Sequence, residues 1–201
     1  MIDETKLGPV GQAFMRLSVL ACGLTADREW VAAQVDAGDE MGSARRAYVR
    51  TMLAFIEGMS HAFRDLLLTA NQAKRVALNV PEIAILSEIQ FQLDGKGNAR
   101  HVRRPLRLRD NVRFIVRLLG RLADTPFEPN FGDQGWRSFL QAVAIRNRVT
   151  HPRTREDMWV TDENLEEVDR AIKWFEDETG RFLHSFKVPF GVDSPEGAAQ
   201  Q

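Results

Sequence analysis

Residues 43–70 read SARRAYVRTMLAFIEGMSHAFRDLLLTA, and this stretch decides the fold class. Its large apolar residues recur three or four positions apart, at Tyr48, Met52, Phe55, Met59, Phe63 and Leu66. A helical turn takes about 3.6 residues, so this spacing puts them all on one helix face. The stretch therefore predicts a long amphipathic helix that buries one side against other elements.

Comparable patterns continue in both directions from this helix. Further helices are predicted over 9–22, 27–36, 81–91, 107–123, 134–151 and 162–185. Pro81 suits a first helical turn, and Thr161 or Asp162 suits a helix N-cap. Asp94-Gly95-Lys96-Gly97-Asn98 predicts a turn or loop, with a hairpin tip as the alternative, although its flanks lack sustained alternation. Together the patterns predict an all-α, up-and-down bundle of about five to seven helices.

The chain of 201 residues is long enough to bury a substantial core. We expect the bundle to occupy residues 43–186, with an N-terminal helical extension over 1–42 and a disordered tail over 187–201. The single cysteine, Cys22, cannot form an intrachain disulfide and is consistent with a reducing compartment. Because Cys22 lies in an apolar run, we expect it in the core.

The overall charge does not indicate nucleic-acid binding, because 27 basic and 28 acidic residues leave a net charge of −1. No apolar run approaches the roughly 18 residues of a membrane span, and no secretory leader opens the chain. We therefore expect a cytoplasmic protein with no membrane partner.

A second informative stretch is RNRVTHPR at residues 146–153. The preceding apolar stripe of Trp136, Phe139, Leu140 and Val143 continues by spacing onto Arg146, Asn147 and Thr150. Burying an unpaired guanidinium costs several kcal/mol, so this pattern indicates a functional site rather than a structural arginine.

The residue types in this stretch suit acid–base chemistry at a phosphate. Asn147 and His151 are four positions apart and share one helix face. Pro152 disfavours the helical conformation of His151, so the helix should end there and the histidine can fold back toward Arg146. An imidazole that titrates near neutrality, a fixed cation and an amide could deprotonate a ribose 2′-hydroxyl and stabilise a phosphorane. The alternative is a surface arginine, with a histidine that favours the helix C-terminus.

The motif Arg146-Asn147-x-x-x-His151, followed by proline, resembles the signature of HEPN-domain ribonucleases. The resemblance implies an all-helical fold and a metal-independent, cofactor-free endoribonuclease that leaves a 2′,3′-cyclic phosphate. It also implies a homodimer that joins two motifs, a toxin or phage-defence role, and an antitoxin or nucleotidyltransferase as partner. In some members an acidic residue of the first long helix approaches the site. Glu57 is the candidate for that residue here, although its match to the family pattern is looser than that of Arg146, Asn147 and His151. A non-catalytic HEPN-like module that binds nucleic acid or protein is the alternative.

Glu57, His61 and Asp65 lie four positions apart on the flank of the long helix. A Glu-x-x-x-His pair can bind a metal, but the sequence offers no convincing further ligands. We therefore predict a solvated, salt-bridged face and no metal.

Arginines are concentrated between residues 100 and 121, and those at 109, 113, 117 and 121 line one helix face. A column of like charges is mildly destabilising, so we expect a compensating partner. RNA phosphates would serve, as would internal or intersubunit pairing with the acidic segment 156–169. The candidate RNA-binding residues are Arg109, Arg113, Arg117, Arg148 and Arg153, and the alternative for the last two is a solvated charge.

Overall fold

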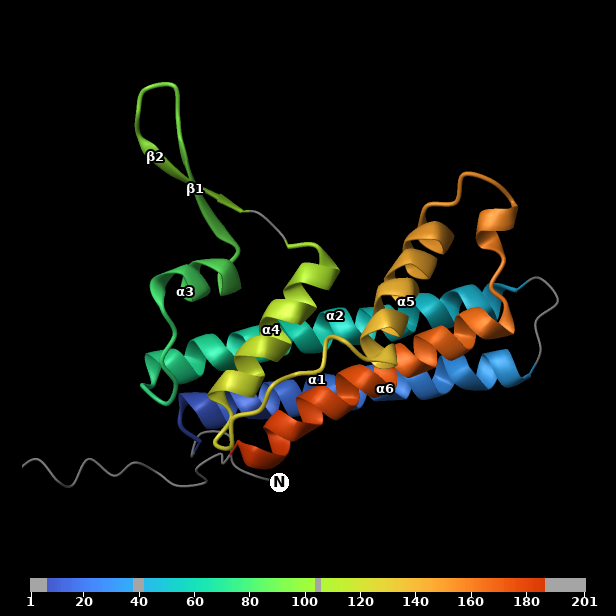
Figure 1. Ribbon diagram of the computed structural model, residues 1–201, viewed down its shortest axis with the longest axis horizontal. Helices are drawn as coiled ribbons and strands as arrows, with labels where there is room; N and C mark the ends of the chain where they lie inside the picture. Colours follow the sequence, from blue (N-terminus) through green and yellow to red (C-terminus); the bar gives the residue numbers. More distant parts are fainter. Residues whose placement is uncertain (1–6, 38–41, 104–105, 187–201) are drawn as a thin grey trace, which may run out of the picture.

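The computed structural model describes residues 7–37, 42–103 and 106–186. Within these ranges the chain forms six α-helices, a short 3-10 turn and one two-stranded sheet (Figure 1). In chain order the elements are α1 Pro9–Asp36, α2 Ser43–Gln72, α3 Val80–Leu86, β1 Ile89–Leu93, β2 Ala99–Arg103, α4 Leu108–Leu122, α5 Gln134–Thr150, η2 Glu156–Met158 and α6 Asp162–Ser185. The predicted all-α class is confirmed.

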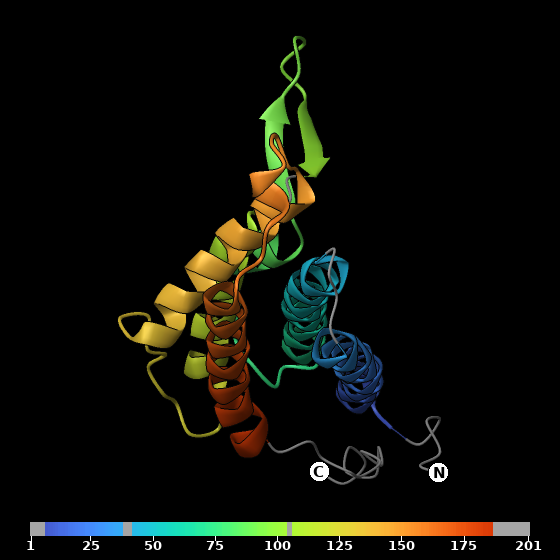
Figure 2. The same ribbon diagram turned by 90° about the vertical axis from the view of Figure 1, so that its right-hand side faces the viewer.

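Helix α2 is the centre of the molecule. Figure 2 shows it between α1 on one side and α4, α5 and α6 on the other, and it contacts all four. Its predicted apolar face is buried at Met52, Phe55, Met59, Phe63 and Leu66. The side chains that an amphipathic pattern placed on one face therefore form the middle of the core.

Helices α5 and α6 pack against each other at the far side of α2. Asp133 caps α5 by accepting from the Trp136 backbone N–H at 2.9 Å. Thr161, one of the two predicted caps, forms a capping box with Asn164 at the start of α6. Gly135 permits the close packing, because a Cβ there would lie 2.6 Å from the Cβ of a tryptophan on α6.

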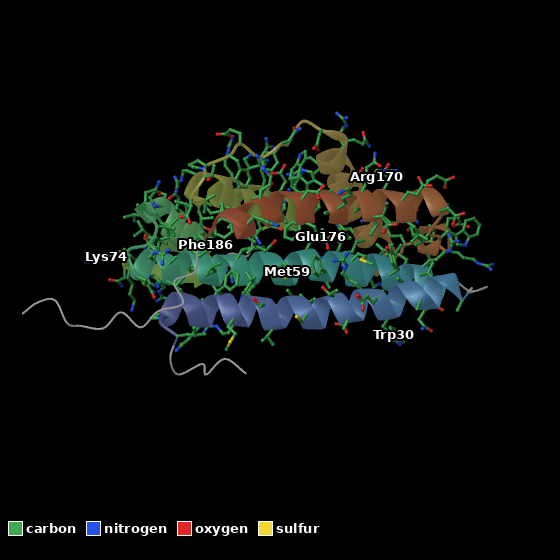
Figure 3. The ribbon with its side chains drawn as sticks, turned by 90° about the horizontal axis from the view of Figure 1, so that it is seen from below. Trp30, Met59, Lys74, Arg170, Glu176 and Phe186 are labelled. Carbon is green, nitrogen blue, oxygen red and sulfur yellow. The ribbon has the colours of Figure 1, made fainter. Side chains whose placement is uncertain are left out.

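The two short helices predicted over 9–22 and 27–36 are wrong, because α1 runs unbroken from Pro9 to Asp36. Residues 23–26 stay helical because Leu24 packs on α2 at Gly58, where a Cβ would lie 2.8 Å from Leu24 Cδ1. Cys22 is exposed on α1, which corrects its expected place in the core. Trp30 also lies on the outer side of α1 and is 67% exposed (Figure 3).

The predicted helix over 81–91 is also wrong in its second half. Helix α3 ends at Leu86, and β1 then pairs antiparallel with β2, with Phe91 opposite His101. Asp94 closes the hairpin by accepting from the backbone N–H groups of Lys96 and Asn98, and Gly97 adopts a positive φ of 81°. The turn chemistry at the tip thus decided in favour of the hairpin alternative. The hairpin projects from the bundle (Figure 1).

The expected tail at 187–201 lies outside the described residues. Among the residues that the structure describes, no helix has both the length and the apolar character that crossing a membrane requires.

Candidate functional site

Three of the four predicted catalytic residues lie together. Glu57 of α2 and Arg146 of α5, 89 positions apart in the chain, form an ion pair in which Arg146 Nη2 donates to Glu57 Oε1. Arg146 Nη1 donates to Asn147 Oδ1 at 3.1 Å. The Arg146 side chain is 24% exposed and that of Glu57 is 43% exposed. The cluster is therefore partly dehydrated yet open to a ligand.

The buried face of α5 differs from the predicted one. It runs through Trp136, Phe139, Ala142, Ile145 and Val149. The expectation that Arg146, Asn147 and Thr150 continue the buried stripe is wrong, since Arg146 is half-buried and the other two are exposed. The prediction placed the buried face through Leu140 and Val143, which are only partly buried: they pack at the edge of the core and also line a cleft.

This cleft opens beside the ion pair, between the start of α4 and the second half of α5. Its volume is about 710 Å³. It is lined by Glu57, Leu106, Arg107, Leu108, Arg109, Leu140, Val143, Ala144, Arg146 and Asn147. Three arginines and one glutamate give this lining a formal charge of +2, whereas the whole chain carries −1. The cleft therefore favours an anionic ligand.

His151 ends α5, as Pro152 predicted. Its backbone N–H donates to the Asn147 carbonyl at 3.0 Å, and its ψ of 60° takes the chain out of the helix. The imidazole is exposed and is not part of the cleft lining. It makes no hydrogen bond to Arg146, Asn147 or any other residue of the described ranges. The predicted fold-back toward Arg146 is thus not a feature of this single chain.

Arg148 holds the loop that follows the motif. Its Nη1 donates to the carbonyl oxygens of Asp157 at 2.9 Å and Trp159 at 2.7 Å. Its Nη2 donates to Asn164 Oδ1 at 3.0 Å. The guanidinium therefore ties α5 to the beginning of α6, which gives Arg148 a structural role in place of the solvated charge that was its alternative. Periodicity offered no signal for these contacts.

A second anchor orders the same loop. Asp157 Oδ2 accepts from the backbone N–H groups of Arg153 at 2.8 Å and Thr154 at 3.0 Å. These two donors hold the pKa of the Asp157 carboxyl below its usual range. The Arg153 side chain itself is exposed. The backbone directly after His151 is thus fixed by Asp157 rather than by the arginine side chain.

The arginine column on α4 has several different partners. Arg109 pairs with Asp110 at 3.1 Å, and the Arg113 guanidinium lies 5.0 Å from the centroid of the Phe131 ring. Arg121 donates twice to Glu82 of α3, at 2.6 and 2.8 Å, and these hydrogen bonds lower the pKa of that carboxyl. Arginines at both ends of the column are thus paired within the chain, with Asp110 and Glu82.

The acidic segment 156–169 is not the compensating partner of that column. Asp162 pairs with Arg45 of α2, and Glu166 and Glu167 pair with Arg170 of α6. Arg117 is exposed on α4 and has no ion-pair partner in the described part of the chain. Of the α4 candidates for RNA contact, only Arg109 lines the cleft.

Glu57, His61 and Asp65 of α2, which the sequence offered as possible metal ligands, each contact a different arginine. Glu57 pairs with Arg146, Asp65 with Arg16 at 3.0 Å, and His61 contacts Arg64 at 2.7 Å. Within the described ranges, no three residues among histidine, cysteine, aspartate and glutamate are grouped to hold a metal ion.

Comparison of the chain with protein-family models, curated proteins and solved structures finds no match. The resemblance to HEPN-domain ribonucleases therefore rests on Arg146, Asn147, His151 and Glu57 alone.

Proposed function

We propose that the protein is a metal-independent endoribonuclease of the HEPN type. One observation carries the proposal: Glu57, Arg146 and Asn147 lie together at the edge of a cleft with a positively charged lining. In some members of the family an acidic residue of a long helix approaches the motif arginine, and Glu57 of α2, the second long helix of this chain, is paired with Arg146 in that way. The reaction itself is inferred from the family resemblance, and Glu57, Arg146 and Asn147 are the residues proposed to bind the phosphate.

The reaction needs one base, one acid and a cation. His151 removes the proton from a ribose 2′-hydroxyl, and the 2′-oxygen attacks the adjacent phosphorus. Arg146 stabilises the charge that builds on the phosphorane oxygens, and Asn147 orients the guanidinium. The bond to the 5′-oxygen then breaks, and that oxygen takes up a proton. The products are a 2′,3′-cyclic phosphate and a 5′-hydroxyl.

The contacts of Arg146 leave room for this role. A guanidinium carries five N–H donors. Glu57 and Asn147 each accept one hydrogen bond from Arg146, so further donors are free to reach a phosphate. The Glu57 carboxylate therefore fixes the direction of the guanidinium without using up its donors.

A second histidine is required for the leaving group, and each motif has only one. A twofold homodimer that juxtaposes two motifs would supply it. The exposed position of His151 at the end of α5 supports this arrangement, because its imidazole is accessible to a second chain. In this proposal the dimer cleaves RNA in the cytoplasm as a toxin or phage-defence protein. An antitoxin or a nucleotidyltransferase is the partner that controls it.

A non-catalytic module that binds nucleic acid is the second candidate. Two observations favour it: the Arg146 charge is neutralised by Glu57, and His151 does not line the cleft. Such a module would use the cationic lining for binding and would leave the RNA intact.

Incubation of 5′-labelled single-stranded RNA with the protein in excess EDTA tests the proposal. We expect cleavage with cyclic-phosphate ends by the wild type and loss of cleavage in Arg146→Gln and His151→Gln. His184→Gln, which changes an exposed histidine of α6, is the matched control and should cleave normally. Cleavage that survives both motif substitutions would refute the site. Tight RNA binding by a folded, inactive wild type would favour the second candidate.

A further inference from the structure

The lining of the cleft beside Arg146 contains five apolar residues, here called the wall, and three arginines, here called the rim, besides Glu57 and Asn147. The wall consists of Leu106, Leu108, Leu140, Val143 and Ala144. The rim consists of Arg107 and Arg109 at the start of α4 and Arg146 on α5. A ligand that fits both parts must carry a flat or apolar body and at least one negative charge.

Arg107, which directly precedes α4, and Arg109, in its first turn, are available to such a ligand. Arg107 is exposed, its side chain does not cap α4, and its guanidinium has no hydrogen-bond partner within the described ranges. Arg109 pairs with Asp110 at 3.1 Å, and both side chains are about half exposed. An ion pair of that kind contributes about 0–1 kcal/mol, so a phosphate can compete for the guanidinium.

We propose that this cleft binds one unpaired ribonucleotide of the substrate, an inference that rests on the proposed ribonuclease function. The base lies on the apolar wall, Arg107 and Arg109 hold the phosphate next to the scissile one, and Arg146 holds the scissile phosphate. The volume of about 710 Å³ is in the range of pockets that enclose a small organic ligand.

The apolar wall decides between single-stranded and duplex RNA. The faces of paired bases are covered by stacking, whereas an unpaired base can turn its face to aliphatic or aromatic side chains. The wall also disfavours an acidic peptide, whose carboxylates would satisfy the arginines but leave the exposed apolar surface of the wall uncovered. The chemistry therefore selects a strand with at least one unstacked base.

Fluorescence anisotropy with a labelled single-stranded 2′-O-methyl oligonucleotide tests the inference. The methyl group removes the attacking hydroxyl, so binding is measured without cleavage. Arg107→Gln and Lys173→Gln each remove one positive charge, and Lys173 lies on α6 outside the cleft lining. We expect Arg107→Gln to weaken binding about tenfold, as loss of a charge-assisted hydrogen bond does. It should also reduce the slope of log affinity against log salt by about 0.7.

The control and the competing ligands complete the test. Lys173→Gln should leave affinity and salt slope unchanged, and the duplex and an abasic version of the oligonucleotide should bind at least several-fold more weakly. Equal effects of the two substitutions, displacement by polyglutamate as readily as by the unlabelled oligonucleotide, or no binding at low salt would overturn the inference.

The two proposals fail in different ways. Binding that depends on Arg107, together with intact unmodified RNA, would keep the nucleotide site and refute the ribonuclease function. Cleavage of RNA by the wild type, together with equal oligonucleotide affinity of Arg107→Gln and Lys173→Gln, would keep the ribonuclease function and refute the nucleotide site.

Discussion

Substitution of Arg148 by methionine should lower stability far more than loss of a surface charge does. Methionine keeps the unbranched stem but removes three hydrogen bonds of 3.0 Å or less, to Asp157, Trp159 and Asn164. The acceptors are partly exposed and can bond water in the variant, so each lost bond costs about 1 kcal/mol. The sum is about 3 kcal/mol, which for a chain of this size lowers the melting temperature by roughly 6–12 °C.

Thermal unfolding followed by circular dichroism measures this difference. Arg153→Met is the matched control, because it removes an equal charge from the loop that Arg148 holds, while the backbone N–H of residue 153 still donates to Asp157. It should melt within about 2 °C of the wild type, as surface substitutions usually do. Equal melting of Arg148→Met and Arg153→Met would refute the structural role of Arg148 and return it to the RNA-binding candidates.

Four further substitutions test the fold and the site. Gly135→Ala should destabilise by about 1–3 kcal/mol in urea, because its Cβ would overlap α6, whereas Gly180→Ala, with open space around it, should stabilise by about 0.5–1 kcal/mol. The hydrogen bond from Arg121 lowers the pKa of Glu82, so the ionised carboxylate stabilises the folded state. This contribution to the free energy of unfolding is complete above the unfolded pKa of about 4.3 and is lost as pH falls through the folded pKa. Glu82→Gln should therefore flatten the decline of the urea midpoint below about pH 4. Glu57→Gln should change stability by less than about 1 kcal/mol and tighten oligonucleotide binding in the anisotropy assay, because the cleft lining rises from +2 to +3.

The elements that were predicted correctly are those whose own sequence contains the signals that determine them, such as a helical apolar pattern or an N-cap residue. Helices α2 and α6 combine an apolar stripe with polar flanks, and α6 has its cap at Thr161. The continuity of helix α1 was not predicted, and the hairpin was only the alternative, because distant or turn-specific contacts stabilise these two features. Leu24 on Gly58 keeps α1 continuous, and the Asp94 side chain stabilises a turn between strands with weak alternation.

The candidate site shows the same division between local and distant information. Arg146 and Asn147 were found because they are neighbours in a motif, and the end of α5 followed from Pro152. No spacing rule links α5 to Glu57, which is 89 positions away, and that pairing was anticipated only through a family resemblance. The cleft was not predicted, because Leu140 and Val143 have the spacing of core residues and pack at the edge of the core while they also line the cleft.

The projecting hairpin gives the chain a natural point of division. Its tip, at Gly95 to Gly97, is exposed and extends away from the helices (Figure 1), and along the chain it lies between α3 and α4. A cut there leaves α1, α2 and α3 in one fragment and α4, α5 and α6 in the other. Because α2 packs against all three helices of the second fragment, the pieces should reassociate through the buried faces that already hold the intact chain together. Ion pairing of Glu57 with Arg146 would then be restored only on complementation, which makes a split form of this protein a switch controlled by fragment concentration.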